Sequence, residues 1–171
     1  MRRFAFIAPL AASLALGSIA IAQPTGAQPT GAPTVNVTLG EDLQEESEKL
    51  GQREVALQVA ELTETVQQTL ASRGALQGAT INLVLTDLKP NRPTFQQAID
   101  RPGLSLIDSL SIGGATIEGE VITAQGQTLP VKFDRYSTSI ADVFGYSTWH
   151  DAERAYDRLA RNLAAGRYVT R

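Results

Sequence analysis

The chain has 171 residues, of which 43% are hydrophobic and 19% charged, and its formal net charge is −3. This composition is typical of a globular protein and excludes a fibrous or wholly disordered chain. The absence of cysteine excludes disulfides, thiol catalysis, thiolate metal sites and the lipid-modified cysteine of a lipoprotein. Because the chain is mildly acidic, we expect no broad attraction to nucleic acid or anionic lipid.

Residues 1–22 have the pattern of a secretory signal peptide. Arg2 and Arg3 precede an apolar run that ends in Ala20-Ile21-Ala22, which fits cleavage after Ala22. The alternative is an uncleaved membrane anchor, although the run is short for spanning. Cleavage would leave 13 basic and 18 acidic residues, a net charge of −5. We therefore expect a periplasmic or secreted product with no membrane insertion after signal cleavage.

Residues 23–34 are expected to form a disordered linker. They consist of two QPTGA repeats followed by PT, and proline and glycine at this density favour an extended, solvated chain. A single folded domain is then expected over 35–166, with a C-terminal tail at 167–171.

The first half of this domain predicts a strand, a long helix and a second strand. Val35 to Leu39 alternates in polarity as a short strand does. Acidic residues at 41–48 suit a helix N-terminus, and we expect the helix to stop at Arg73-Gly74. The alternating run from Ala79 to Asp87 predicts a central strand. The predicted apolar stripe of the helix is Val55, Val59, Leu62, Val66 and Leu70.

A short helix is expected next, over Phe95 to Asp100, with Thr94 as its N-cap. The apolar but glycine- and serine-rich segment from 104 to 114 reads as an ordered connection. It leads into the segment around which the domain is organised, a β-hairpin from Thr116 to Tyr136. A turn at Gln125-Gly126-Gln127 pairs Ala124 with Thr128, which places Glu120 opposite Lys132.

The chain then predicts a folded-back loop and a last helix. The loop, 137–147, carries more hydrophobic residues than a free loop should. Thr148 is the expected cap of the helix, with Asp151 three residues later, and Gly166 is its expected end. Its predicted buried stripe is Trp149, Ala152, Tyr156, Leu159 and Leu163.

The resulting order, β-α-β-(short α)-β-β-α, predicts an α+β fold. The strand–helix–strand start implies two parallel strands, and the hairpin adds antiparallel ones. We expect a two-layer sandwich in which a mixed sheet of about four strands carries two long helices on one face.

Candidate chemistry is sparse. His150 is the only histidine, and its neighbours Ser147 and Asp151 make these three the catalytic candidates, although capping of the last helix and a solvated position of His150 in its first turn explain them better. A zinc site would need three or four ligands, so we expect no metal and no cofactor. Glu118 and Glu120 share one face of a strand, where Lys132 would keep Glu120 ionised.

Four aromatic residues cluster in the sequence before and at the start of the last helix. They are Tyr136, Phe144, Tyr146 and Trp149. Most are expected in the core, and those left exposed would form a recognition surface, so these residues are the binding candidates.

The run NRPTFQQAIDRPGLSLIDSLSIGGATIEGEVI, followed by TWHDAERAYDRLARNLA, resembles secreted proteobacterial envelope domains of unknown function, over about 35–166. The resemblance implies an envelope setting and an α+β fold, and it carries no catalytic residues. We therefore expect an exported, non-catalytic binding or assembly module of the bacterial cell envelope, with an envelope protein as partner. The alternatives are a small periplasmic hydrolase that uses His150 and a carrier of a small apolar ligand.

Overall fold

The computed structural model describes residues 31–170, so the predicted signal peptide and most of the predicted linker lie outside the described residues. The strands are β1 (Thr34–Leu39), β2 (Thr80–Lys89), β3 (Gly114–Ile122), β4 (Thr128–Tyr136) and β5 (Val169–Thr170). The helices are α1 (Glu41–Leu50), α2 (Gln52–Ser72), α3 (Phe95–Asp100) and α4 (His150–Ala164), with a 3₁₀ turn, η1, at Ile140–Val143.

The strands form one sheet in chain order, β1-β2-β3-β4-β5. β1 is parallel to β2, the pairs β2–β3 and β3–β4 are antiparallel, and β5 is parallel to β4. The predicted α+β class and mixed sheet are confirmed, but the predicted count of four strands is wrong. The fifth strand lies in the predicted C-terminal tail, where the N–H of Lys132 donates to the carbonyl of Tyr168. Two paired residues are too few to show a strand pattern in a sequence.

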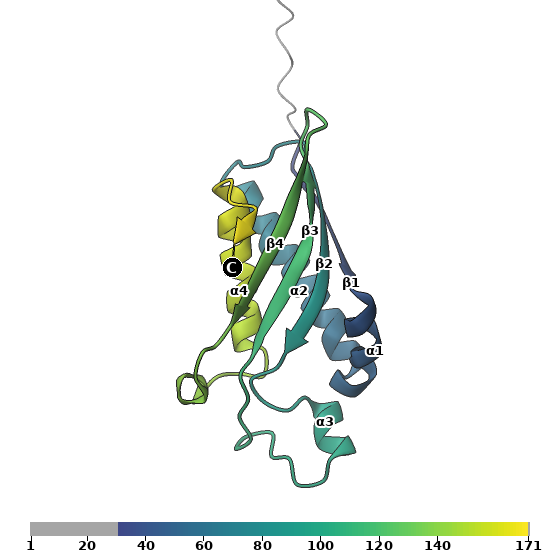
Figure 1. Ribbon diagram of the computed structural model, residues 1–171, viewed down its shortest axis with the longest axis vertical. Coiled ribbons are helices and arrows are strands. Elements are labelled where there is room, and N and C mark those ends of the chain that lie inside the picture. The colour runs from purple at the N-terminus through teal and green to yellow at the C-terminus, as the bar shows by residue number, and fades with distance from the viewer. Residues whose placement is uncertain (1–30, 171) are drawn as a thin grey trace, which may run out of the picture.

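Helices α2 and α4 pack against each other and against the same face of the sheet, and both lie behind the strands in Figure 1. Between the two layers lies a core of fully buried apolar side chains. The opposite face of the strands, which we call the open face, carries side chains that are half-buried or exposed. The largest core side chains include Leu62, Leu70, Ile81, Leu83, Leu85, Ile117, Tyr156, Leu159 and Leu163.

The predicted long helix is in fact two helices that meet at Gly51. Its φ of +96° lies in the left-handed region, which glycine adopts without the steric cost of a Cβ. The break allows α1 and α2 each to bury its own apolar side chains, such as Leu43 and Leu62. The predicted stop is confirmed, because α2 ends at Ser72 and Gly74 has a φ of +59°. No helix within residues 31–170 has the length and apolar character needed to cross a membrane.

The folded region begins a few residues before the predicted boundary at 35. The carbonyl of Gly31 accepts a hydrogen bond of 2.7 Å from the N–H of Gly78, and the N–H of Thr34 donates to Ala79. Pro33 is buried. The last residues of the predicted linker therefore belong to the domain.

The β3–β4 hairpin is present, but its predicted register is wrong by two residues. Ile122 pairs with Thr128 and Glu118 with Lys132, and the loop is Ala124-Gln125-Gly126. Gly126, with a φ of +78°, takes the last loop position, as in a three-residue hairpin that ends in a left-handed residue. Because the error is an even number, each side chain stays on its predicted face.

Candidate functional site

Two long connections meet at the end of the sheet that is farthest from Thr34, which we call the distal end. There Lys89 pairs with Gly114, and Gly114 pairs with Tyr136. Residues 90–113, which include α3, and residues 137–149, which include η1, both lie at this end in Figure 1, and α4 begins there. The distal end thus collects most of the irregular chain of the domain, where binding residues are commonly found.

A buried pair of polar side chains, Asn91 and Asp151, holds these connections together. Both are almost inaccessible, with exposed fractions of 0% and 3%. The amide nitrogen of Asn91 donates to the Asp151 carboxylate at 2.6 Å, and the amide oxygen of Asn91 accepts from the N–H of Asp151 at 2.9 Å. Asn91 therefore caps the N-terminus of α4 from a segment 60 positions earlier in the chain.

This arrangement replaces the predicted cap. The N-cap of α4 is Trp149, without a side-chain hydrogen bond, so the prediction that Thr148 caps the helix is wrong. The carbonyl of Thr148 accepts instead from the N–H of Asn91 at 2.7 Å. The hydroxyl of Ser137 donates to the Asp151 carboxylate at 2.6 Å, which ties in the end of β4.

The connection before β3 is fixed by the same asparagine. The N–H of Ser111 donates to the carbonyl of Asn91, and the Asn91 amide donates to the carbonyl of Ser111. A Cβ added at Gly113 would lie 2.6 Å from the Asn91 side chain, so only glycine fits there. We call Asn91, Ser111, Ser137 and Asp151 the polar knot. It joins four segments of the distal end, so the loops there have a rigid base.

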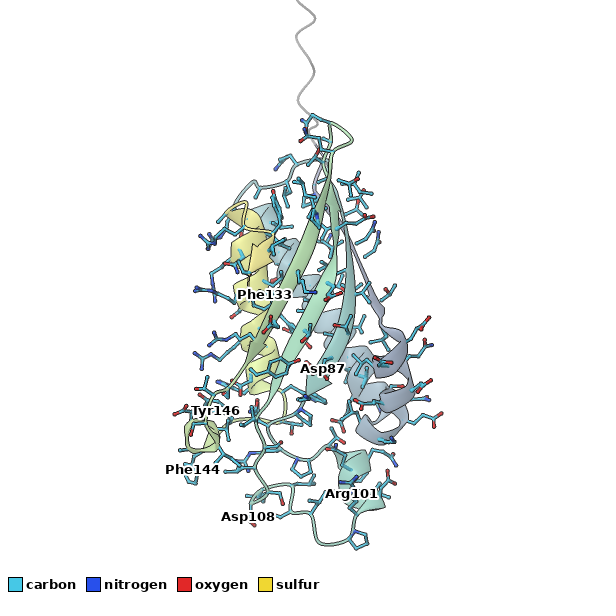
Figure 2. The ribbon with its side chains drawn as sticks, in the orientation of Figure 1. Asp87, Arg101, Asp108, Phe133, Phe144 and Tyr146 are labelled. Atoms are coloured by element: carbon cyan, nitrogen blue, oxygen red, sulfur yellow. The ribbon has the colours of Figure 1, made fainter. Side chains whose placement is uncertain are left out.

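Large apolar side chains are exposed on these loops. Of the nine such side chains in residues 31–170, seven lie on α3, the following connection or the η1 segment. Phe144 and Ile107 are the most exposed of all, at 85% and 75%, and Figure 2 labels Phe144 at the tip of its loop. We call the set the distal apolar surface: Phe95, Ile99, Leu106, Ile107, Ile112, Ile140 and Phe144.

A cavity of about 290 Å³ lies between α3 and the connection that follows it. Its wall is mainly apolar and includes Pro90, Pro93, Leu104, Leu110 and Ile112. Ile112 belongs to the distal apolar surface as well, so the surface is hollowed beside α3. A hollow of this kind can accept one apolar side chain of a partner.

The catalytic candidates Ser147, His150 and Asp151 are close in sequence but do not form a relay. The Asp151 carboxylate is bound by Asn91 and Ser137 within the polar knot. The His150 ring stacks on Tyr146, with the ring centroids 3.9 Å apart. Ser147 is exposed, and no hydrogen bond among the described residues joins its side chain to either of the other two.

The four aromatic candidates are placed differently from one another. Trp149 is buried in the core, and Tyr146 is half-buried against His150. Tyr136 lies on the open face of the sheet, and only Phe144 is fully exposed. Of the four candidates the sequence pattern therefore led to one fully exposed residue, Phe144, whereas the exposed residues of 95–112 were not singled out because their apolar character indicated burial equally well.

The open face of the sheet carries Glu118 and Glu120, the two carboxylates that the sequence pattern singled out. Lys132 pairs with Glu118 at 2.9 Å, not with Glu120 as predicted, because of the register difference. Glu120 accepts a hydrogen bond of 3.3 Å from Asn82, which in turn accepts from Asn36. Both carboxylates are engaged in cross-strand pairs on an exposed surface, which is a stabilising role in a sheet.

Tyr136 forms a second polar group on this face. Its hydroxyl donates to Asp87 at 2.6 Å and is 2.6 Å from the hydroxyl of Thr116. Burial, together with the hydrogen bond to Asp87, raises the pKa of Tyr136 well above its usual value. Lys89 lies 3.3 Å from Asp87 and over the tyrosine ring. A phenol with a raised pKa stays protonated, so it serves here as a hydrogen-bond donor.

No group of three or more histidine and carboxylate side chains in the described part of the chain is arranged to hold a metal ion. No protein-family model and no curated protein sequence matches the chain. Function is therefore inferred from the residues and their arrangement alone.

Proposed function

We propose that this protein is an exported, non-catalytic binding or assembly module of the bacterial cell envelope, which engages a partner protein through the distal apolar surface. The observation that carries the proposal is the exposure of Phe144, Ile107 and their neighbours on ordered loops at one end of the domain. Exposed large apolar side chains that gather in one region are characteristic of protein–protein contact sites.

The polar knot supports this role because it fixes the loops before any partner arrives. A loop that is already ordered loses less conformational entropy on binding, so more of the contact free energy contributes to affinity. The hollow beside α3 adds a concave element to this surface. Flat or convex apolar surfaces with one such hollow fit a protein partner better than a small ligand.

The sequence supports the export and orientation parts of the proposal. The leader pattern at 1–22 indicates secretion, and the repeats that follow it indicate a spacer. The described chain enters the domain beside Thr34, at the end opposite to the distal apolar surface. A domain tethered through its N-terminal side would therefore present this surface outward.

Site-specific photocrosslinking tests the proposal. A photoreactive phenylalanine analogue is placed at 144 or 107 in the full chain, which is expressed in its host and irradiated. A matched control carries the analogue at Leu57, which is 58% exposed on α2 and outside the distal apolar surface. We expect one discrete crosslinked envelope protein from 144 and 107 and none from 57.

Two outcomes of the crosslinking experiment would count against the proposal. The same products from all three positions, or no product from 144 and 107, would contradict a specific contact at the distal apolar surface. Fractionation of the same cells checks the location, and recovery of the protein in the cytoplasm would contradict the export part of the proposal.

A further inference from the structure

A second candidate site lies outside the distal apolar surface, at the edge of the sheet beside α4. It is a cavity of about 330 Å³ between α4 and the strands β4 and β5. Its wall comprises Phe133, Asp134, Arg135, Arg158, Asn162, Arg167 and Thr170. Figure 2 labels Phe133 on β4 next to α4 and shows nitrogen-tipped side chains along the outer side of that helix.

The charge of this cavity differs from that of the chain. Three arginines and one aspartate line it, whereas the whole sequence has a net charge of −3. Within residues 31–170, none of the guanidinium groups of Arg135, Arg158 and Arg167 lies within 4.0 Å of a carboxylate. The neighbouring Arg161, by contrast, lies 3.8 Å from Asp157. The cavity therefore carries an excess of positive charge, and none of its three arginines forms an ion pair within the described residues.

One of the three arginines is held in place by an uncharged, buried side chain. Arg167 donates through Nε and Nη2 to the amide oxygen of Asn162, at 3.3 and 2.9 Å. Asn162 is only 3% exposed, and its amide nitrogen donates to the hydroxyl of Thr170 on β5 at 3.1 Å. A neutral amide orients the guanidinium group without neutralising its charge, so the arginine remains available to an anion.

We propose that this cavity binds a phosphoryl group. Guanidinium groups from β4, from α4 and from the chain after α4 surround it, and their planar forks match phosphate oxygens in bidentate geometry. The three arginines and Asp134 leave two positive charges, which a phosphate monoester balances and a single carboxylate does not. The size admits the phosphoryl group with a small attached group such as glycerol.

The ligand could be a soluble phosphate ester or the headgroup of a phospholipid, and two titrations distinguish these sources. Glycerol 3-phosphate is titrated into the purified full chain by calorimetry, and vesicles containing phosphatidic acid are tested by co-sedimentation, with phosphatidylcholine vesicles as the blank. Arg158→Gln and Arg135→Gln remove cavity charges, and Arg161→Gln removes one charge from the same helix outside the cavity.

We expect binding in at least one of the two titrations. Arg158→Gln and Arg135→Gln should each weaken this binding about tenfold or more, whereas Arg161→Gln should weaken it less than twofold. All three variants alter exposed side chains, so each should keep the thermal midpoint of the wild type. Absence of binding in both titrations would overturn the proposal. So would an equal loss in Arg161→Gln, which would indicate attraction to general charge rather than a site.

Discussion

Replacement of Asn91 by alanine tests whether the polar knot is what makes the distal end rigid. The substitution removes the donor that lies 2.6 Å from the Asp151 carboxylate and the acceptor for the N–H of Asp151. It also removes the side-chain hydrogen bond to the carbonyl of Ser111. The buried carboxylate would keep only the hydroxyl of Ser137 as a side-chain partner.

The expected cost follows from these contacts. Loss of a hydrogen bond to a charged group costs about 1.5–3 kcal/mol, and loss of a helix N-cap costs about 1 kcal/mol. We therefore expect Asn91→Ala to lower the free energy of unfolding by roughly 2.5–4 kcal/mol. Against a typical total of about 5–15 kcal/mol, this is a large fraction of the stability of a domain.

Urea unfolding followed by tryptophan fluorescence measures the effect, because the single tryptophan, Trp149, is buried at the N-terminus of α4. The matched control is Asn36→Ala, which removes an exposed hydrogen bond to Asn82 on the open face and should cost less than about 0.5 kcal/mol. A loss below about 1 kcal/mol for Asn91→Ala would contradict a stabilising role of the polar knot.

Three further predictions concern single side chains. Gly119→Ala should prevent folding or cost more than about 4 kcal/mol, because the new Cβ would overlap the carbonyl oxygen of Asn82 and φ is +145°. A folded variant whose free energy of unfolding in urea falls by less than about 2 kcal/mol would contradict this. Tyr156→Phe should raise the free energy of unfolding by about 1 kcal/mol, and with it the thermal midpoint, because it removes a buried hydroxyl that has no hydrogen-bond partner in residues 31–170. A lower thermal midpoint than that of the wild type would contradict this prediction. Burial and the hydrogen bond to Asp87 raise the pKa of Tyr136 in the folded state, so the stability that depends on the protonated phenol is complete below about pH 10 and declines at higher pH. Urea midpoints at about pH 8 and pH 11 should therefore differ less in Tyr136→Phe than in the wild type, and an unchanged difference would show that another group is responsible.

Local periodicity explains what the sequence revealed of the fold. The stripe of α4 is a pattern of one helix, and all five of its predicted residues are buried. The faces of the β3–β4 hairpin follow from alternation in the same way. The register of the hairpin does not follow from alternation. It depends on which loop position Gly126 occupies, and a left-handed glycine suits either end of several turn types.

Breaks and short pairings were harder to predict. Gly51 was visible in the sequence, but the acidic residues before it and the apolar stripe after it both fit one continuous helix. Strand β5 has two residues, and it is defined by its neighbour β4 rather than by any pattern of its own.

The candidate site was mostly hidden in the sequence because its residues come together only in the fold. Asn91 stands between two prolines after β2, and its partner Asp151 lies 60 positions later in the chain. Thr148 offered a plausible local cap, which concealed the cap supplied by Asn91. The one available signal was the number of large apolar residues in the segments 104–112 and 137–147, and a sequence cannot tell which of them the core covers.

The most direct test of the central claim is the affinity of the domain for the partner that Phe144 crosslinks. Binding of the purified partner is measured for the wild type, for the double variant Ile107→Asp/Phe144→Asp and for the control Leu57→Asp. We expect the double variant to bind about a hundredfold or more weakly, since loss of two large apolar contacts costs roughly 3 kcal/mol or more, whereas the control should bind like the wild type. Equal affinity of the double variant and the wild type would contradict a contact at the distal apolar surface.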